Sequence, residues 1–252
     1  MDKRYQNDMI TGRNPVMEAL KAGRPINKIF ILQGEREGMA RVIMAMAIER
    51  GIVVQQVAKA KLDGLTGGGV HQGVVAMASL KQYSDVDDIF DVAKERNEPA
   101  FIIVLDEIED THNLGSIIRT CDAAGVHGVI IPKRRSATIT PIVGKSSAGA
   151  IEYVAVARVS NIAETLKQLK KRGVWIIGAD TDGDIPFTQC DMKGSIALVI
   201  GGEGKGVGRL VKETCDFLVN VPMKGKISSL NASVAAGILM YEALRQRTVF
   251  SG

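Results

Sequence analysis

Short apolar runs alternate with amphipathic stretches along most of the chain, most regularly from residue 100 onward. Runs of about five apolar residues are strand candidates, and segments with apolar residues at i, i+3, i+4 and i+7 indicate helices. This alternation predicts an α/β fold with a mainly parallel sheet. The expected strands are 101–105, 129–131, 153–159, 174–178, 196–200 and 217–221, and the expected helices are 114–124, 161–172, 207–214 and 230–247.

The first eighty residues show the same alternation in a smaller unit. A short helix is expected to open near Pro15, because proline is favoured in a first helical turn. The expected strands here are 28–32, 52–57 and 74–80, and the expected helices are 37–50 and 58–65. Residues 81–98 are polar and acidic and are closed by Pro99, which indicates a linker with a short helix. We therefore expect a small domain over 1–80, a linker over 81–98 and a second domain over 99–252.

The composition is typical of a globular chain, with 46% hydrophobic, 24% charged and 4% aromatic residues. No apolar run reaches the roughly 18 residues of a membrane span, and the first twenty residues do not resemble a signal peptide, so no membrane partner is expected. Cys121, Cys190 and Cys215 are odd in number and lack CxxC spacing, which indicates reduced thiols in a cytoplasmic protein. The three histidines are widely spaced, and no metal site is expected.

The net charge of +4 is concentrated at one end of the chain. Residues 1–80 hold 11 Lys and Arg against 7 Asp and Glu, whereas the remaining 172 residues hold 21 of each. A basic N-terminal domain favours an anionic partner such as a nucleic acid. A solvated surface with a chance imbalance gives the same count, so charge alone leaves both interpretations open.

Three polar segments are candidates for chemistry, and the first is the helix expected at 114–124. Leu114 and the apolar residues three, four and seven positions later form one buried face. Arg119 lies about 140° around from Leu114, on the polar face. Asn113 is placed to cap the start of the helix. Taken alone, this segment is explained better by an ordinary helix cap together with a solvated arginine than by a catalytic site.

The second segment is the loop IGGEGKG at 200–206. It departs from the phosphate-loop pattern, because Val199 stands where the first glycine is required and Gly206 where Ser or Thr is required. It also lacks GxGxxG spacing after the first strand, which disfavours a nucleotide-dependent oxidoreductase. Glu203 lies among glycines that let a ligand approach the backbone closely. A flexible turn is the alternative interpretation.

The third segment is the cluster SSLNAS at 228–233, where the helix expected at 230–247 begins. Free N–H groups at a helix start, with hydroxyl or amide side chains such as Ser229 and Asn231, can bind a carboxylate, a phosphate or a ribose. Capping of the helix by Ser229 is the alternative. The helix itself is rich in Ala and Gly, which suits close packing, for instance against another subunit.

In this order, the three segments resemble the signature motifs of the SpoU family of S-adenosylmethionine-dependent RNA ribose 2′-O-methyltransferases. The resemblance rests on Asn113 with Arg119, on the IGGEGKG loop with Glu203, and on VPM followed by SSLNASVAAGILMYE. It covers residues 101–247, over half of the chain. The first domain, with GRNPVMEAL at 12–20 and HQGVV at 71–75, is similar to the small RNA-binding domain of ribosomal-protein L30e type that is attached to bacterial members.

This resemblance implies a catalytic α/β domain with a deep C-terminal trefoil knot, an exception to the rule that chains are unknotted. It also implies S-adenosylmethionine as methyl donor, a homodimer with its active site completed across the interface, and a guanosine ribose of 23S ribosomal RNA as substrate. The residues implied to bind the donor are Gly201, Gly202, Val221, Leu230, Ala179 and Thr181. The residues implied to be catalytic are Arg119, Asn113, Glu203, Ser229 and Asn231.

The resemblance to the SpoU family implies that Arg119 activates the ribose hydroxyl. This is chemically awkward, because a guanidinium with a pKa above about 12 rarely releases its proton. We prefer the hypothesis that Arg119 clamps the adjacent phosphate and steadies the developing alkoxide. A sulfonium donor is already electrophilic, so the reaction needs placement of a weakly acidic hydroxyl and no metal. Asn113 and Arg119 lie about 240° apart around a helix, which favours a site built from two subunits.

RNA contact is expected mainly from the first domain, with Arg13, Asn14, His71 and Gln72 as candidates. This domain has only two aromatic residues, so phosphate and shape contacts are favoured over base stacking. Two alternatives remain, namely a transfer-RNA ribose 2′-O-methyltransferase and a non-catalytic RNA-binding assembly factor of the same fold. The N-terminal domain favours ribosomal RNA, and the intact motif residues argue against a loss of catalysis.

Overall fold

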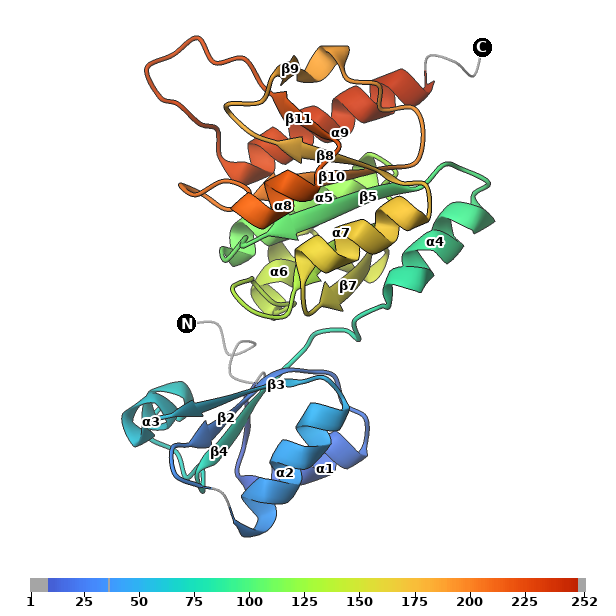
Figure 1. The fold of residues 1–252 in the computed structure, drawn as a ribbon. Helices are drawn as coiled ribbons and strands as arrows, with labels where there is room; N and C mark the ends of the chain where they lie inside the picture. The colour runs from blue at the N-terminus through green and yellow to red at the C-terminus, as the bar shows by residue number, and fades with distance from the viewer. Residues whose placement is uncertain (1–8, 36, 249–252) are drawn as a thin grey trace. The chain divides into compact units, whose positions relative to one another are not determined.

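The structure, a computed structural model, describes residues 9–35 and 37–248. Its contacts divide the chain into two compact units. The first comprises Met1–Gln82 with Thr138–Pro141, and the second comprises Tyr83–Ala137 with Ile142–Gly252. Each unit has a sheet and a hydrophobic core of its own. Figure 1 shows the elements of both.

The first unit contains a four-stranded mixed sheet in the order β1–β4–β2–β3. β2 is parallel to β3 and antiparallel to β4, and β4 is antiparallel to β1. Its elements are β1 (Met9–Thr11), α1 (Arg13–Lys21), β2 (Ile26–Leu32), α2 (Gly38–Glu49), β3 (Val53–Val57), α3 (Lys59–Thr66) and β4 (Val74–Ala78). β1 was not predicted from the sequence, because a strand of three residues is too short to show its period.

Helices cover both faces of this small sheet (Figure 1). On one face, α1 and α2 pack Leu20 and Ile43 against Ile29 of β2. On the other face, α3 packs Leu62 against Phe30 of β2. Ile29 and Phe30 are consecutive, and consecutive strand residues point to opposite faces. One central strand thus supplies both layers of the core.

The second unit contains a seven-stranded sheet in the order β7–β6–β5–β10–β8–β11–β9, and every adjacent pair is parallel. This confirms the predicted α/β fold with a parallel sheet. The strands are β5 (Phe101–Asp106), β6 (Gly128–Pro132), β7 (Ala155–Val159), β8 (Trp175–Ala179), β9 (Ile185–Pro186), β10 (Ile196–Gly201) and β11 (Phe217–Asn220). The helices are α4 (Val86–Glu95), α5 (Thr111–Ala123), α6 (Pro141–Ser146), α7 (Ile162–Lys171), α8 (Arg209–Thr214) and α9 (Ala232–Thr248).

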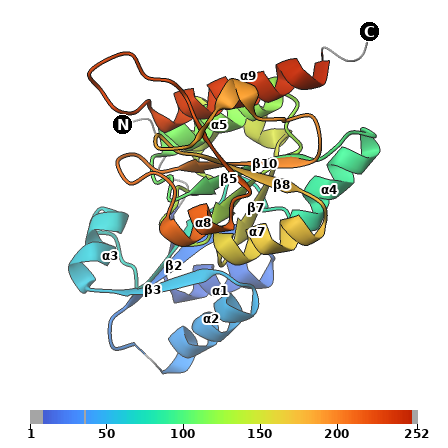
Figure 2. The ribbon, with the colours of Figure 1, turned by 45° about the horizontal axis from the view of Figure 1, so that its top comes forward.

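Helices also cover both faces of this larger sheet, as Figure 2 shows. On one face, Ile89 of α4, Leu166 of α7 and Val211 of α8 pack into a single core. On the other face lie α5 and α9, where the Cys121 Sγ is 3.7 Å from the Met240 Sδ. In the described part of the chain, no helix is long and apolar enough to span a bilayer.

The strand order places a ligand crevice between β5 and β10. From β5 the chain continues to β6 and β7 on one side, while β10, β8 and β11 lie on the other side. The two central strands are paired along their whole length and end together at Asp106 and Gly201. In open parallel sheets, ligands bind beyond the carboxyl ends of the strands at such a reversal of strand order.

Three features differ from the sequence-based expectations. α4 lies within the stretch expected to be a linker, yet Ile89 and Ala93 are buried in the core of the second unit. The acidic residues around them hid this apolar stripe, so the second unit starts at Tyr83 and not at residue 99. α6 and β9, with six and two residues, were missed because such short elements have no readable period.

Candidate active site

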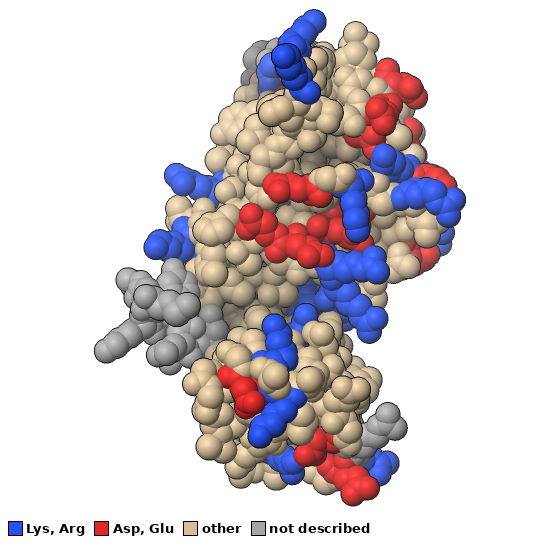
Figure 3. Space-filling view, turned by 90° about the vertical axis from the view of Figure 1, so that its left-hand side faces the viewer, with Lys and Arg blue, Asp and Glu red and all other residues tan. Residues whose placement is uncertain are grey.

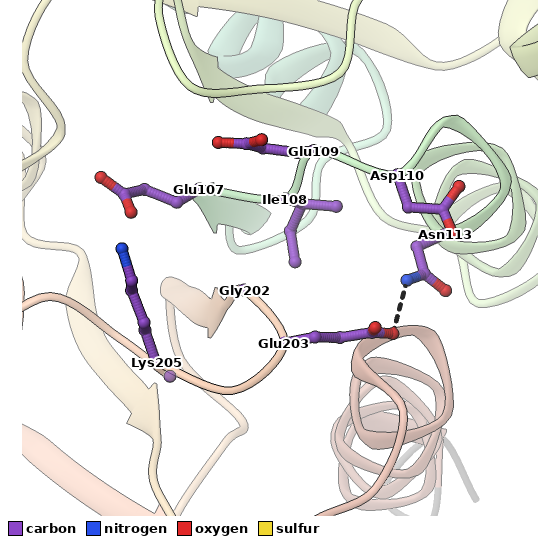
Figure 4. Close-up of a pocket in the computed structure, with 9 residues that line it drawn as sticks. Glu107, Ile108, Glu109, Asp110, Asn113, Gly202, Glu203 and Lys205 are labelled. Carbon is purple, nitrogen blue, oxygen red and sulfur yellow. Dashed lines mark hydrogen bonds between the residues drawn. The ribbon is translucent and has the colours of Figure 1, made fainter.

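A cavity of about 370 Å³ opens at the carboxyl ends of β5 and β10. In Figure 4 the ammonium group of Lys205 points toward Glu107, and the side chains of Asn113 and Glu203 meet. The lining is strongly acidic, with four carboxylates and a single lysine. The lining residues are Glu107, Ile108, Glu109, Asp110, Asn113, Gly202, Glu203, Lys205 and Gly206.

Asn113 is held in place by the first turn of α5. The Asp110 Oδ1 accepts a hydrogen bond from the backbone N–H of His112 at 2.7 Å and so caps this helix. Asn113 is the third residue of the helix and is 7% exposed. The prediction that Asn113 caps the helix is therefore wrong, because α5 begins two residues before it. Its amide is free to contact the loop that follows β10.

The loop after β10 is folded tightly on itself. Gly202 and Gly206 form an antiparallel bridge, in which the N–H of Gly206 donates to the carbonyl of Gly202 at 3.0 Å. A Cβ on Gly201 would overlap the backbone of Gly206 and Val207, and a Cβ on Gly202 would lie 2.5 Å from the carbonyl oxygen of Glu107. Close backbone approach therefore requires glycine at both positions. This packing argues against a flexible turn.

Asp106, the last residue of β5, ties the two strand ends together. Its Oδ2 accepts a hydrogen bond from the N–H of Gly208 at 2.8 Å, directly before α8. Desolvation of the buried carboxyl raises the pKa of Asp106, and the hydrogen bond from Gly208 acts in the opposite direction. The loop that carries Glu203 is thereby fixed at both ends.

Asn231 caps the start of α9. Its Oδ1 accepts hydrogen bonds from the Ser233 backbone N–H at 3.0 Å and from the Ser233 hydroxyl at 2.6 Å. Ser229, the alternative cap, lies two residues further upstream and is exposed. The cap therefore belongs to Asn231. It fixes the orientation of the amide, because the oxygen is engaged with the helix and the nitrogen faces the other way.

Three side chains from the three candidate segments meet in one hydrogen-bond network. The Asn113 Nδ2 donates to the Glu203 Oε1 at 2.8 Å. The Asn231 Nδ2 donates to the same oxygen at 2.7 Å and to the Asn113 Oδ1 at 3.0 Å. A carboxylate has acceptor capacity for about four hydrogen bonds. Within the described residues the Glu203 Oε2 has no partner, so it is available to a ligand in the cavity.

Arg119 and Ser229 lie outside this network. Arg119 is exposed on α5, six residues beyond Asn113, and its guanidinium has no hydrogen bond or ion pair among the residues that the structure describes. Six helical residues correspond to about 9 Å along the axis and about one and two-thirds turns around it. The structure thus brings together three of the five residues implied to be catalytic.

The residues implied to bind the methyl donor lie at the ends of three adjacent strands. Gly201 ends β10, Ala179 ends β8 and pairs with Val219 of β11, and Val221 follows β11 directly. The other three, Thr181, Gly202 and Leu230, lie in the loops beyond these strand ends. All six positions are therefore at the carboxyl edge of the sheet, on the side of β10 that faces β8 and β11 or in the loops beyond it.

In the first unit, the predicted RNA-binding residues Arg13 and Gln72 come together across the sequence. The Arg13 Nε donates to the backbone carbonyl of Gln72 at 2.9 Å, and its Nη2 pairs with the Glu35 Oε1 at 2.6 Å. Asn14 is exposed beside them. The Arg13 guanidinium is therefore oriented by protein groups and remains partly exposed.

His71 faces inward, in contrast to these residues. It is 8% exposed, and its Nε2 lies 3.0 Å from the Asp63 Oδ1. Its Nδ1 accepts a hydrogen bond from the N–H of Gly73 at 3.0 Å, which places the ring proton of the neutral form on Nε2. The ring therefore supports the loop that presents Gln72.

The sequence did not single out the cavity-lining residues Glu107, Glu109 and Lys205, nor the buried Asp106 that precedes them. The available signal was the stretch LDEIED at 105–110, where carboxylates follow a buried strand directly. Carboxylates in loops are usually solvated, so this pattern alone did not single them out. Among the residues that the structure describes, no group of three or more His, Cys, Asp or Glu is arranged to hold a metal ion.

Comparison with known protein families shows to which family the chain belongs. Residues 100–241, more than half of the chain, match the SpoU rRNA methylase family. The chain belongs to this family. Residues 9–84 match the domain described as RNA 2′-O ribose methyltransferase substrate binding. These matches confirm the predicted resemblance over both units, and the protein is a SpoU-family RNA methyltransferase.

Similar proteins extend along nearly the whole SpoU-family chain. A putative TrmH-family tRNA/rRNA methyltransferase, YacO of Bacillus subtilis (strain 168), is 50% identical over 242 residues, which are 96% of this chain and 97% of the relative. The SpoU methyltransferase AviRb from Streptomyces viridochromogenes, solved in complex with the cofactor AdoMet, is 29% identical with a TM-score of 0.61 and covers 97% of this chain and 91% of its own. The A. aeolicus TrmH/SpoU tRNA modifying enzyme is 31% identical with a TM-score of 0.55 and covers 60% of this chain and 76% of its own.

Proposed function

We propose that this SpoU-family enzyme transfers a methyl group from S-adenosylmethionine to the ribose 2′-hydroxyl of a guanosine in 23S ribosomal RNA. The observation that carries the proposal is the hydrogen-bond network of Asn113, Glu203 and Asn231. Each residue comes from a different family motif, and the network lies where parallel sheets bind ligands. The choice of guanosine and of 23S RNA rests on the family resemblance.

S-adenosylmethionine is supported as the donor by the AdoMet complex of AviRb. The residues at the implied donor site also fit such a ligand by position, because Ala179, Gly201 and Val221 lie at the carboxyl ends of adjacent parallel strands, where open sheets bind ligands. The donor supplies a methyl group on a positively charged sulfur. The protein then has to place the acceptor hydroxyl in line with that methyl group and keep it there.

The acceptor ribose is assigned to the cavity beside Glu203. A ribose hydroxyl donates to a carboxylate oxygen and accepts from an amide N–H, and the network offers both kinds of group. The Glu203 Oε2 is the acceptor with no partner among the described residues. Asn113 and Asn231 hold the other carboxylate oxygen, so Glu203 cannot rotate freely. This orientation would place the 2′-hydroxyl for attack.

Arg119 is assigned to the phosphate next to the acceptor ribose, at the active site of a partner subunit. It is exposed, it has no side-chain partner among the described residues, and it lies outside the network of its own chain. A guanidinium keeps its charge at all physiological pH values and binds a phosphate with two parallel hydrogen bonds. A homodimer in which α5 of one subunit approaches the cavity of the other would use it in this way.

Ribosomal RNA is favoured over transfer RNA by the first unit. Residues 9–84 match a substrate-binding domain, whereas the similarity to the A. aeolicus tRNA modifying enzyme covers 60% of this chain. A tRNA substrate would leave the role of this additional unit unexplained. The relative in Bacillus subtilis is a putative tRNA/rRNA methyltransferase, so transfer RNA is the second candidate substrate.

Transfer of labelled methyl groups from S-adenosylmethionine to unmodified 23S RNA and to bulk transfer RNA, in separate reactions, tests the substrate. We expect label in 23S RNA and none above background in transfer RNA. Label only in transfer RNA would keep the enzyme class and overturn the ribosomal assignment. No label in either RNA, with measurable donor binding, would favour the non-catalytic assembly factor.

A further inference from the structure

A cluster of positive charge lies at the same edge of the sheet as the acidic cavity. Lys133, Arg134 and Arg135, here called the basic turn, follow β6 directly. β6 is paired in parallel with β5, so both strands end at the same edge. The basic turn belongs to the second unit and is separate from the positive excess of the first eighty residues.

The backbone of the basic turn is anchored to its neighbours. The N–H of Lys133 donates to the carbonyl of Val159 at 2.8 Å, and the Arg158 Nη2 donates to the carbonyl of Lys133 at 3.2 Å. Shortly after the turn, the N–H of Ala137 donates to the carbonyl of Ile108 at 2.7 Å. The turn therefore has a defined position, which reduces the entropy lost when its side chains bind a ligand.

Arg135 connects the basic turn to the wall of the cavity. Its Nη1 lies 3.0 Å from the Glu107 Oε1, and Glu107 lines the cavity. Arg135 is 75% exposed, so this pair still presents positive charge to solvent. Arg134 is exposed, and its side chain has no hydrogen bond or ion pair within the described part of the chain.

The cavity and the basic turn suit different parts of one nucleotide. Four carboxylates line the cavity, and they disfavour a phosphate there by like-charge repulsion. Ribose hydroxyls and base amino groups are neutral hydrogen-bond donors, which carboxylates accept well. A nucleotide in the cavity therefore keeps its phosphates outside, and the basic turn is a cationic group at that same edge of the sheet. Figure 3 shows acidic and basic side chains side by side on one face of the second unit.

We infer that the basic turn binds RNA backbone phosphates further along the strand than the one assigned to Arg119, and that it orients the strand so that the ribose enters the acidic cavity. The inference rests on the proposed function, because it takes RNA as the substrate of this cavity. Lys133 and Arg134 supply the phosphate contacts, and Arg135 holds the turn against Glu107. Recognition of this kind positions the backbone and is independent of base sequence.

The test is the salt dependence of RNA binding by the full-length protein with Lys133→Gln and Arg134→Gln combined. Arg135 stays intact, so the cavity wall is preserved. Binding is measured with unmodified 23S RNA, made by transcription, at 50 to 200 mM salt and without methyl donor. The matched control combines Lys94→Gln and Lys171→Gln, because both residues are exposed in the last turns of α4 and α7, which lead into strands at the opposite edge of the sheet.

The logarithm of the RNA-binding constant falls linearly with the logarithm of the salt concentration, and each lost phosphate contact makes this slope less steep by about 0.7 to 0.9. We expect the basic-turn variant to lose about 1.5 in slope and to bind RNA at least fivefold more weakly at 100 mM salt, with unchanged affinity for S-adenosylmethionine. In methyl-transfer assays the KM for RNA should rise by a similar factor, while kcat at saturating RNA stays within twofold.

A slope equal to that of wild type, or an equal loss in the control variant, would overturn the inference. The binding assay contains no methyl donor, so it is independent of catalysis. Suppose that the slopes of wild type and of the basic-turn variant differ as expected while wild type transfers no methyl group. In that case the basic turn keeps its role in RNA binding and the proposed function fails.

Discussion

Glu203 is the residue on which the three motif segments converge. One of its oxygens accepts hydrogen bonds from Asn113 and Asn231. The Asn231 Oδ1 is held by Ser233 at the start of α9, and the Asn113 Oδ1 accepts from the Asn231 amide. Two fixed donors on one oxygen orient the carboxylate and leave the second oxygen toward the cavity. Activity should therefore depend on the amide groups as much as on the charge of Glu203.

Replacing Asn231 with Asp separates its two roles. Asp caps a helix as well as Asn does, so α9 should keep its stability. The new carboxylate would face the Glu203 Oε1, where the amide now lies at 2.7 Å, and repulsion should turn Glu203 away. We expect kcat/KM to fall at least tenfold, about 1.4 kcal/mol, with little change in Tm.

Asn161→Asp is the matched control for this substitution. Asn161 caps α7 through the same kind of bond, with its side-chain oxygen 3.1 Å from the N–H of Glu164, and it does not line the cavity. Its activity should equal that of wild type. Wild-type activity in Asn231→Asp would show that the network does not position Glu203.

His127 is a buried residue with a predictable effect on stability. Its Nδ1 accepts a hydrogen bond from the N–H of Phe101 at 2.9 Å, and its Nε2 lies 3.0 Å from Glu98. Desolvation lowers the pKa of His127 below its usual 6.5, although Glu98 acts in the opposite direction. The unfolded chain therefore takes up its proton first as the pH falls. The contribution of neutral His127 to the stability of the folded protein is therefore complete above pH 6.5 and is lost as the pH falls below this value.

His127→Gln should reduce this pH dependence, because an amide can accept from Phe101 and donate to Glu98 without titrating. We expect the Tm of wild type to fall more than the Tm of the variant between pH 7 and pH 5 in calorimetry. Parallel Tm curves for the two proteins would contradict the assignment.

At the scale of elements, the loop after β10 is where the packing constraint is strongest. Gly201→Ala places a Cβ onto the backbone of Gly206 and Val207, which cannot move without displacing the loop that carries Glu203. We expect a loss of about 1 to 3 kcal/mol in the free energy of unfolding and a loss of methyl transfer. Gly194→Ala is the control, because a Cβ there meets nothing within 4 Å. Equal behaviour of the two variants in denaturant titrations would contradict this account.

Helices and strands long enough to show a repeating apolar pattern were predictable from the sequence. Very short elements, and a helix whose apolar residues lie among acidic ones, were not. β5 and β10 are apolar along their length and were recovered almost to the residue. β9, with two residues, has no period to detect, and the buried stripe of α4 is hidden among aspartates. In the site, the predicted start of the helix was wrong by three residues, because Asp110 and not Asn113 caps it.

The meeting of distant segments could be predicted only through the family resemblance. Asn113 and Asn231 are 118 residues apart, and no local pattern relates them. The cavity carboxylates Glu107 and Glu109 escaped notice for the opposite reason, since an acidic loop is ordinary when its surroundings are unknown. The deep trefoil knot implied by the family stays a prediction.

At the level of the whole molecule, we expect a homodimer with shared active sites. If Arg119 of one subunit acts in the cavity of the other, Arg119→Ala and Glu203→Ala are defects in different halves of each site. Mixing the two inactive variants after unfolding and refolding should give half hybrid dimers, each with one intact site of two. We expect about a quarter of wild-type activity. No recovery, with subunit exchange verified by mass, would place Arg119 in the site of its own chain.

The most direct test of the central claim is the chemical position of the transferred methyl group. Alkali cleaves RNA only where a free 2′-hydroxyl can attack the neighbouring phosphate, so a ribose 2′-O-methyl group leaves an alkali-resistant dinucleotide. After reaction of unmodified 23S RNA with labelled S-adenosylmethionine, we expect all label in resistant dinucleotides beginning with guanosine, and none with Glu203→Ala. Label released in mononucleotides would locate the methyl group on a base and contradict the account.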